Sequence, residues 1–241
     1  MRARRIAVID YGTGNLKSVV KAFEYLGANV SLTRKPEDVG EIDAIVFPGQ
    51  GSYDQCMNCL MQSGLDHLVK KWVQQDRPFF GICFGMQLSL IEFARNVLML
   101  KKANSTELNK NCIPIIGLIE EWYKDGILKK GDLKKLGGTM RLGSYECNLL
   151  EGSMVKKIYK AKKIYERHRH RYEVNISYKD KFEGKGLIFS GLSNNNKLPE
   201  IIELKSHPWF VGVQFHPEFK SRPLSPHPLF ASFIKAAKTK N

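Results

Sequence analysis

Short apolar runs alternate with segments of helical periodicity in the first part of the chain. Four apolar runs end at polar or glycine-rich turns, as buried strands do, and they cover residues 5–10, 30–33, 42–48 and 78–82. Apolar residues spaced by three and four predict helices over residues 16–26 and 56–75, and a further helix beginning near Met86. This alternation predicts an α/β fold with a mostly parallel sheet and helices on both faces.

The pattern is less regular in the rest of the chain. Residues 112–143 are rich in lysine and glycine and predict mainly loop. Further strands are expected near residues 163–166, 187–190, 201–204 and 210–215, followed by a closing helix over 228–237. No internal repeat, low-complexity tract or long linker divides the sequence, so we expect residues 1–241 to form a single domain.

Composition excludes several classes of protein. A chain of 241 residues with 43% hydrophobic and 26% charged residues suits one globular domain. No apolar run of about 18 residues occurs, so no membrane span is expected. The apolar run at residues 6–10 is too short for a signal peptide. The five cysteines are odd in number and form no disulfide framework, which favours a reducing cytoplasm.

The chain is strongly basic, with 38 Lys and Arg against 24 Asp and Glu and a formal net charge of +14. Such a charge suits nucleic acid or an acidic partner. The lysines are scattered as pairs, however, and no RNA-binding aromatic signature or zinc-finger spacing accompanies them. We therefore do not expect nucleic acid, and we interpret the charge as an aid to solubility or to docking on an acidic partner surface.

The segment 79–87 (Phe-Phe-Gly-Ile-Cys-Phe-Gly-Met-Gln) carries the strongest chemical signal. A strand followed by Gly-x-Cys-x-Gly and a helix is typical of a nucleophile elbow, in which a sharp turn exposes the central residue. The Cys83 thiol would lie at a helix N-terminus, whose partial positive charge favours the thiolate. The amide of Phe84 would face the substrate oxygen. The alternative is a buried structural cysteine in a glycine-rich turn.

A cysteine nucleophile needs a base, and the base needs an orienting group. Residues 211–218 (Val-Gly-Val-Gln-Phe-His-Pro-Glu) supply both. In an extended segment, His216 and Glu218 project to the same face, so Glu218 could hold one ring nitrogen while the other takes the thiol proton. The alternative is an edge-strand histidine beside a surface glutamate.

A third candidate is the segment Pro48-Gly49-Gln50-Gly51, which follows an apolar strand. Glycines there let backbone N–H groups approach a ligand, as an oxyanion hole requires. The alternative is an ordinary turn between a strand and a helix.

Together these motifs resemble the class I (triad) glutamine amidotransferases, which have a three-layer, flavodoxin-like fold. The resemblance implies hydrolysis of L-glutamine to glutamate and ammonia through a cysteinyl thioester, without a cofactor. It implies Cys83 as nucleophile, His216 as base and then acid, and Glu218 as orienting group. It also implies an oxyanion hole formed by the amides of Phe84 and of Gly49 or Gly51.

Two parts of the chain resemble different members of that family. From about residue 88 onward, the chain resembles the glutaminase domain of CTP synthase, an enzyme of pyrimidine nucleotide biosynthesis. The shared runs cover residues 91–98, 104–107, 137–143, 166–175, 207–210, 221–223 and 227–230. Residues 1–87 instead resemble the glutaminase subunit of imidazole glycerol phosphate synthase, in residues 8–16 and in the loop 48–51, where Gln50 departs from the CTP synthase pattern.

The resemblance also implies a glutamine pocket. Gln87 and Glu107 would bind polar groups of the substrate, and the Glu107 carboxylate suits its ammonium. Arg171 and Tyr172 would lie beside the pocket, where a guanidinium meets the α-carboxylate. An alternative for Arg171 is a basic loop on the surface that faces a partner.

The same resemblance implies a synthase or amidoligase domain or subunit that accepts the ammonia. No segment resembles the ATP-dependent amidoligase domain of CTP synthase, so we expect that this chain does not make CTP by itself. Three alternatives stay open: ammonia supply to the imidazole glycerol phosphate synthase cyclase in histidine biosynthesis, a non-catalytic partner-binding module with an inactive triad, and a γ-glutamyl peptidase.

Two patterns suggest a metal, but neither is complete. Cys56 and Cys59 form C-x-x-C on an expected helix without a second pair at zinc spacing. His168 and His170 alternate like ligands, but arginines flank both of them and oppose a cation. We therefore expect no metal.

Overall fold

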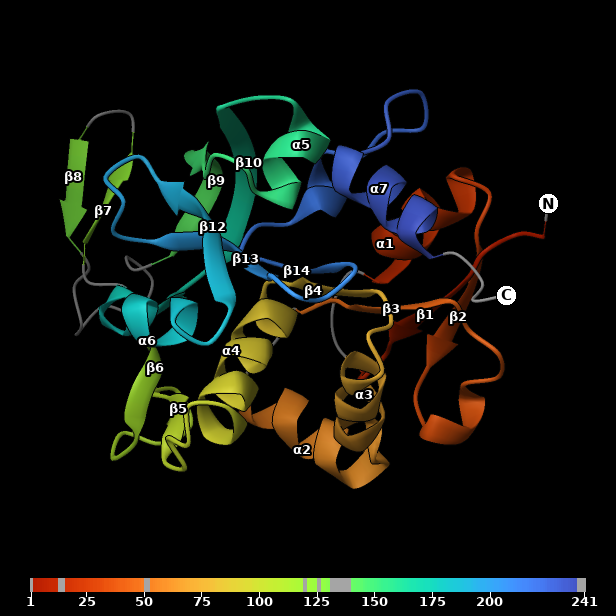
Figure 1. Cartoon of the computed structure of the whole chain (residues 1–241), viewed down its shortest axis with the longest axis horizontal. Coiled ribbons are helices and arrows are strands. Elements are labelled where there is room, and N and C mark those ends of the chain that lie inside the picture. Colours follow the sequence, from red (N-terminus) through yellow and green to blue (C-terminus); the bar gives the residue numbers. More distant parts are fainter. Residues whose placement is uncertain are drawn as a thin grey trace.

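The computed structural model describes residues 2–12, 16–49, 53–118, 121–124, 127–130 and 140–237. A nine-stranded sheet runs through the middle of the molecule, and helices cover both of its faces (Figure 1). This arrangement confirms the expected three-layer α/β fold. No helix in the described ranges has the length and apolar character needed to cross a membrane.

One end of the sheet is parallel, in the order β14-β4-β3-β1-β2. These strands are β1 (Arg5–Ile9), β2 (Asn29–Thr33), β3 (Ala44–Phe47), β4 (Phe79–Ile82) and β14 (Phe210–Val213). The first four coincide with the four apolar runs of the sequence. Their carboxyl ends lie at the same edge of the sheet, which is where α/β proteins place their sites.

The other end of the sheet is antiparallel and continues in the order β10-β9-β12-β13 to β14. Its strands are β9 (Arg141–Leu149), β10 (Lys163–His170), β12 (Leu187–Ser193) and β13 (Pro199–Leu204). The strands expected near residues 163–166, 187–190 and 201–204 are confirmed as β10, β12 and β13. β9 and the antiparallel pairing were not predicted; β12 and β13 follow one another with only a short turn between them, as antiparallel neighbours can.

Helices α1 (Leu16–Tyr25), α5 (Met154–Tyr159) and α7 (Pro228–Ala236) cover one face of the sheet (Figure 1). The opposite face carries α2 (Tyr53–Ser63), α3 (Leu65–Gln74), α4 (Phe84–Asn96) and α6 (Lys179–Glu183). The single helix predicted over 56–75 is wrong. Two helices occupy this region, because Gly64 adopts a φ of 75° that right-handed helix does not permit.

The expectation of loop over residues 112–143 is also wrong. This region contains β6 (Ile113–Leu118), the hairpin β7 (Glu121–Lys124) and β8 (Ile127–Lys130), and the start of β9. β6 forms a small sheet with β5 (Ala103–Ser105) and β11 (Tyr172–Val174). Short 3₁₀ turns in the described ranges lie at Pro36–Asp38, Ile176–Tyr178 and Pro217–Phe219.

The two large hydrophobic cores lie on the two faces of the sheet, and successive residues of each central strand alternate between them. In β1, Ile6 and Val8 join the core beneath α1 and α7, whereas Ala7 and Ile9 join the core beneath α3 and α4. Because both faces are buried, the central strands are apolar throughout, which is why the sequence displayed them as continuous runs.

Candidate active site

Cys83 occupies the sharp turn between β4 and α4. Its backbone has φ 51° and ψ −101°, in a region that side chains other than glycine rarely adopt. The neighbouring glycines allow the turn to be this tight. A Cβ on Gly81 would lie 2.9 Å from the carbonyl carbon of Gly85, and a Cβ on Gly85 would lie 2.1 Å from the carbonyl oxygen of Phe47. The geometry is that of the predicted nucleophile elbow.

The loop after β3 lies directly against this elbow. A Cβ on Gly49 would lie 2.5 Å from the amide nitrogen of Phe84, so the backbones of Gly49 and Phe84 are in contact. The hydroxyl of Tyr11 donates to the carbonyl oxygen of Pro48 at 2.8 Å and fixes the loop. Two of the three residues expected in an oxyanion hole are therefore adjacent. Gly51 lies outside the described residues.

His216 and Glu218 lie just beyond the carboxyl end of β14, which pairs with β4. The amide of Cys83 donates to the carbonyl oxygen of Val213 at 2.6 Å, so the two strand ends are held together. The Nδ1 of His216 lies 2.8 Å from Glu218 Oε1, and both side chains are buried. The expected extended conformation is wrong, because a 3₁₀ turn beginning at Pro217 brings the two side chains together instead.

Burial by itself would lower the pKa of the His216 imidazole. The Cys83 thiol and the Glu218 carboxylate outweigh burial and raise that pKa to about 10. The Nε2 of His216 has no partner at hydrogen-bonding geometry within the described part of the chain, although Cys83 is near enough to act on its charge. At neutral pH the imidazole therefore holds a proton.

Of the four residues expected in a glutamine pocket, Gln87 lies beside Cys83 and contacts the Tyr172 backbone, while Glu107 and Arg171 act on the Tyr172 phenol. The amide of Gln87 donates to the carbonyl oxygen of Cys83 at 3.1 Å, and its side-chain Nε2 donates to the carbonyl oxygen of Tyr172 at 3.0 Å. Burial and the nearby Glu107 carboxylate raise the pKa of the Tyr172 phenol, and Arg171 lowers it. Glu107 and Arg171 are therefore both close to Tyr172.

The sequence analysis gave no role to Gln214, which contacts the Cys83 sulfur. Its Nε2 lies 3.6 Å from Cys83 Sγ, and its Oε1 accepts from Gln87 Nε2 at 3.1 Å. Gln214 is fully buried. Its position immediately after β14, two residues before His216, is the only signal in the sequence that could have pointed to it.

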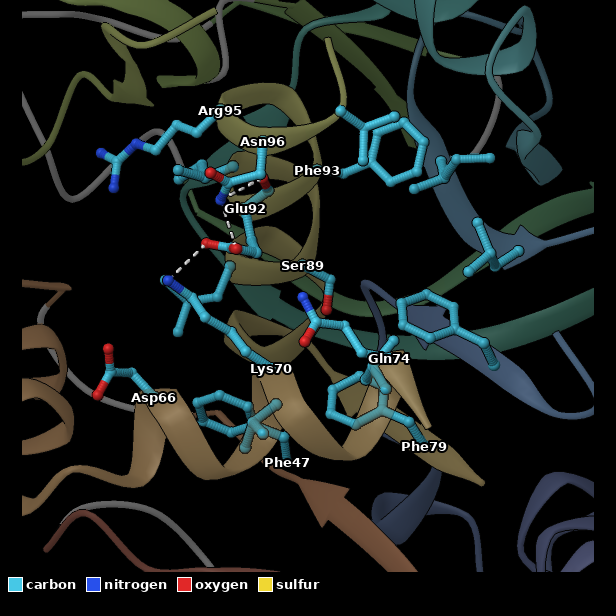
Figure 2. Close-up of a pocket in the computed structure, with 18 of the residues that line it drawn as sticks. Phe47, Asp66, Lys70, Gln74, Phe79, Ser89, Glu92, Phe93, Arg95 and Asn96 are labelled. Atoms are coloured by element: carbon cyan, nitrogen blue, oxygen red, sulfur yellow. Dashed lines mark hydrogen bonds and ion pairs between the residues drawn. The ribbon is translucent and has the colours of Figure 1, made fainter. Parts of the chain in front are cut away.

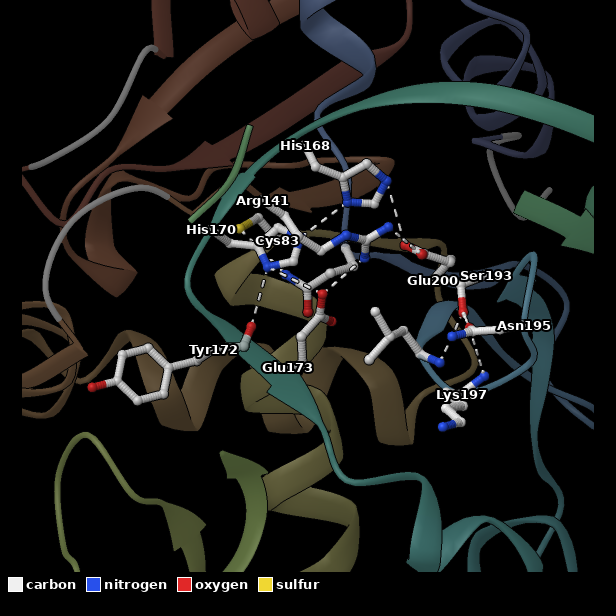
Figure 3. Close-up of polar contacts among 12 residues, drawn as sticks. Cys83, Arg141, His168, His170, Tyr172, Glu173, Ser193, Asn195, Lys197 and Glu200 are labelled. Atoms are coloured by element: carbon white, nitrogen blue, oxygen red, sulfur yellow. Dashed lines mark hydrogen bonds and ion pairs between the residues drawn. The ribbon is translucent and has the colours of Figure 1, made fainter. Parts of the chain in front are cut away.

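A buried cluster of charged residues was also missed (Figure 3). Arg141 donates from Nη1 to Glu173 Oε1 and from Nη2 to Glu200 Oε1, both at 2.8 Å. Nearby, His168 Nδ1 lies 2.9 Å from His170 Nε2. These residues are polar and so gave no hydrophobic signal, yet each is at least nine-tenths buried.

Two carboxylates share one guanidinium in this cluster. Burial, opposed by Arg141 and assisted by Glu200, raises the pKa of Glu173 to about 8. Burial, and then the positive charge of Arg141, lowers the pKa values of His168 and His170 well below the ordinary histidine value. The two histidines are therefore neutral. Within the described ranges, no group of three or more His, Cys, Asp or Glu side chains is arranged so that it could hold a metal ion.

A separate cavity of about 480 Å³ lies between α3 and α4, over Phe47 and Phe79 (Figure 2). Its walls are mainly apolar, and Lys70 and Glu92 form an ion pair of 3.1 Å across it. Cys83, His216 and Glu218 are not among the residues that line it. This cavity is therefore distinct from the cysteine–histidine site.

Comparison with known proteins agrees with this fold and this geometry. The family model for class-I glutamine amidotransferases matches residues 7–236. The match includes the elbow, the loop after β3 and the end of β14. The chain therefore belongs to the class-I glutamine amidotransferase family.

Its relatives include CTP synthases. The chain is 72% identical over 161 residues to the CTP synthase of Pelagibacter ubique, which covers 67% of this chain and 30% of that protein. It is 56% identical over 206 residues to the CTP synthase of Hyphomonas neptunium, which covers 83% of this chain and 36% of that protein. The chain thus spans about a third of the length of these relatives. The second match covers 83% of the chain, which is more than residues 88–241 make up. Similarity to CTP synthase therefore extends into the N-terminal part.

Solved structures give the same relationship. The glutaminase domain of Trypanosoma brucei CTPS with bound acivicin is 29% identical, with a TM-score of 0.74, covering 99% of this chain and 95% of that chain. A Thermoplasma acidophilum protein assigned to GMP synthase has a TM-score of 0.63 at 16% identity, covering 98% of this chain and 95% of that chain, and shows the shared fold alone. The chain is a glutamine amidotransferase domain similar to the glutaminase domains of CTP synthases.

Proposed function

We propose that residues 1–241 form one glutaminase domain that hydrolyses L-glutamine to glutamate and ammonia. The observation that carries this proposal is the strained turn at Cys83 beside the 2.8 Å contact of His216 with Glu218. Elbow, base and orienting carboxylate are the parts that covalent catalysis by cysteine needs.

In the proposed mechanism, the Cys83 thiolate attacks the side-chain carbonyl carbon of glutamine. The backbone amides of Phe84 and Gly49 stabilise the oxyanion of the tetrahedral intermediate. The carbon–nitrogen bond then breaks, and His216 gives its proton to the leaving nitrogen, which departs as ammonia. A water molecule then attacks the carbonyl carbon of the γ-glutamyl thioester, and His216 takes a proton from this water. The carbon–sulfur bond breaks, which releases glutamate and returns the sulfur to Cys83.

The substrate would be held through its amino-acid end. The Glu107 carboxylate is assigned to the ammonium, and the Arg171 guanidinium is assigned to the α-carboxylate, for which its planar fork is suited. In this assignment, Gln87 and Tyr172 lie between the amino-acid end of the substrate and the turn at Cys83. Their mutual contact at 3.0 Å and the electrostatic effect of Glu107 and Arg171 on Tyr172 support this assignment.

The ammonia would pass to an amidoligase domain or subunit of the kind present in CTP synthases. The partner is proposed because the chain matches only about a third of each of these relatives, and because it matches the glutaminase domain of Trypanosoma brucei CTPS over 99% of its own length. All five cysteines lie within the described residues and none of them forms a disulfide, which supports a reducing cytoplasm as the place of the reaction.

The decisive experiment combines labelling with an activity assay. We expect 6-diazo-5-oxo-L-norleucine to label Cys83 stoichiometrically, with protection by glutamine, as located by mass spectrometry. Cys83→Ala should lose glutaminase activity by at least a factor of about 10³ and keep its thermal unfolding temperature. Cys112→Ala, which removes a half-buried thiol elsewhere, is the matched control and should retain activity.

The assay is repeated with a separately prepared amidoligase domain of a CTP synthase, and this addition should increase glutamine hydrolysis. Full activity in the Cys83→Ala variant would refute the catalytic assignment. If the wild-type chain is not labelled and is inactive with and without the amidoligase domain, the proposal of a glutaminase fails.

A further inference from the structure

Hydrogen bonds between two buried side-chain amides connect the glutamine pocket to the nucleophile. Gln87 Nε2 donates to the carbonyl oxygen of Tyr172 at 3.0 Å and to Gln214 Oε1 at 3.1 Å. Gln214 Nε2 in turn donates to Cys83 Sγ at 3.6 Å. Gln87 is 5% exposed and Gln214 is 0% exposed, so solvent does not compete for these groups.

The orientation of the Gln214 amide is fixed by this chain of contacts. The Tyr172 carbonyl can only accept a hydrogen bond, so it requires the nitrogen of Gln87 on its side. Because the Gln87 nitrogen is a donor, the atom of Gln214 that faces it must be the acceptor, which is the side-chain oxygen. If the Gln214 amide were reversed, two N–H₂ groups would face one another and an oxygen would face the sulfur. The amide nitrogen of Gln214 is therefore the group presented to Cys83.

A donor in this position has a particular chemical value. The positive charge of His216 stabilises a thiolate only while the ring holds its proton, and the ring gives that proton to the leaving nitrogen. An amide does not titrate, so it can donate to the sulfur whenever the sulfur carries negative charge. Hydrogen bonds to charged groups in a buried site are about twice as strong as those between neutral groups.

We propose that Gln214 is a further catalytic residue, which donates a hydrogen bond to the Cys83 sulfur and stabilises it as the thiolate both before attack and when the thioester breaks. This inference rests on the proposed function for its place in the reaction. The hydrogen bond itself can be tested without glutamine.

The test measures the alkylation rate of Cys83 by iodoacetamide between pH 5 and pH 10, followed by mass spectrometry of the peptide that contains Cys83. In Gln214→Met, which keeps the length of the side chain but removes the donor, the rate profile should move to higher pH. At the acidic end the rate should fall about tenfold, the size expected for a lost hydrogen bond to a charged group. Gln75→Leu, on an exposed residue of the same type, should match the wild type.

Circular dichroism and thermal unfolding establish that each variant is folded. A folded Gln214→Met protein with the wild-type rate profile would overturn the proposal. If this variant does not fold, the wild-type protein decides: the side-chain ¹⁵NH₂ signal of Gln214 should shift with the same pH midpoint as the alkylation of Cys83, and a signal that does not respond to pH would refute the hydrogen bond.

The proposed function is tested separately by labelling of the wild-type chain with 6-diazo-5-oxo-L-norleucine. Failure of that labelling, together with the absence of glutaminase activity with and without the amidoligase domain, would refute the glutamine site. It would leave the comparison of iodoacetamide rates, and therefore the inference on Gln214, intact. The two failures are thus distinguishable.

Discussion

At the scale of single residues, the site depends on backbone contacts that leave no space for a Cβ atom. The positive φ of Cys83 costs on the order of 1–3 kcal/mol, and the surrounding packing has to maintain it. Gly85 is the residue that allows this packing, because its Cα lies against the Phe47 carbonyl. The Gly-x-Cys-x-Gly pattern predicted the elbow because only glycine satisfies such contacts.

We predict that Gly85→Ala destabilises the protein and removes its activity. Alanine favours a helix over glycine by about 1 kcal/mol, but a Cβ placed 2.1 Å from the Phe47 carbonyl oxygen forces β3 and α4 apart at a larger cost of about 1–3 kcal/mol or more. Urea unfolding and the glutaminase assay measure both effects. Gly40→Ala is the control, since nothing lies within 4 Å of its Cβ position and its φ is not positive. A Gly85→Ala protein as stable and as active as Gly40→Ala would contradict the argument.

At the scale of secondary structure elements, β10 shows what the sequence could and could not reveal. Its residues alternate between exposed and buried along its whole length. The buried positions include His168 and His170. Because these side chains are polar, the pattern of apolar residues did not predict the strand beyond residue 166. The parallel strands were predicted because apolar side chains cover both of their faces. The antiparallel half contains buried charges, for which hydrophobic periodicity has no signature.

The charges buried between β9 and its neighbours lead to a prediction about stability. Arg141→Met should lower the free energy of unfolding by about 3–5 kcal/mol, because it leaves Glu173 and Glu200 buried without a cation. Lys163→Met removes a cation of β10 that is 57% exposed and pairs with Glu146, so it should cost far less than Arg141→Met, because solvent screens an exposed pair. Urea unfolding at pH 7.5 compares the two variants. Equal losses would show that burial does not decide the strength of these pairs.

At the scale of the whole molecule, buried polar residues connect strands that are distant in the sequence, and the histidines among them link folding to pH. The sequence predicted the three layers and the position of the elbow. The links between layers were not predictable, because they depend on which polar groups meet across strands that are distant in the sequence. Arg141, Glu173 and Glu200 come from β9, β11 and β13, and no local pattern relates them.

We predict that the two buried histidines decrease the free energy of unfolding as pH falls below about 6.5. Glu173 contributes with the opposite sign, because its raised pKa of about 8 lets the folded protein hold a proton that the unfolded chain has lost, so the histidine contribution is measured as a difference between variants. The pKa values of His168 and His170 are lowered in the folded protein, first by burial and then by Arg141. Below the ordinary histidine pKa, the unfolded chain therefore binds protons that the folded protein does not. Each histidine contributes up to about 1.4 kcal/mol per pH unit, and this contribution to stability is present above that pH and is lost below it.

Urea unfolding between pH 5 and pH 7 measures this dependence. His170→Gln removes one of the two groups and should give a shallower decrease than the wild type. His67→Gln is the control, because the His67 side chain is 84% exposed, and it should reproduce the wild-type slope. Identical slopes in all three proteins would refute the linkage.

The contact between the ends of β4 and β14 also has a consequence for how the protein is made. Cys83 and Gln214 are separated by 131 residues, and His216 follows later still. The ribosome therefore releases the cysteine long before the groups that activate it. In the proposed mechanism, Cys83 becomes reactive only when the last strand of the sheet docks beside β4. Synthesis from the N-terminus thus delays the reactive sulfur in that mechanism until the folded protein buries it.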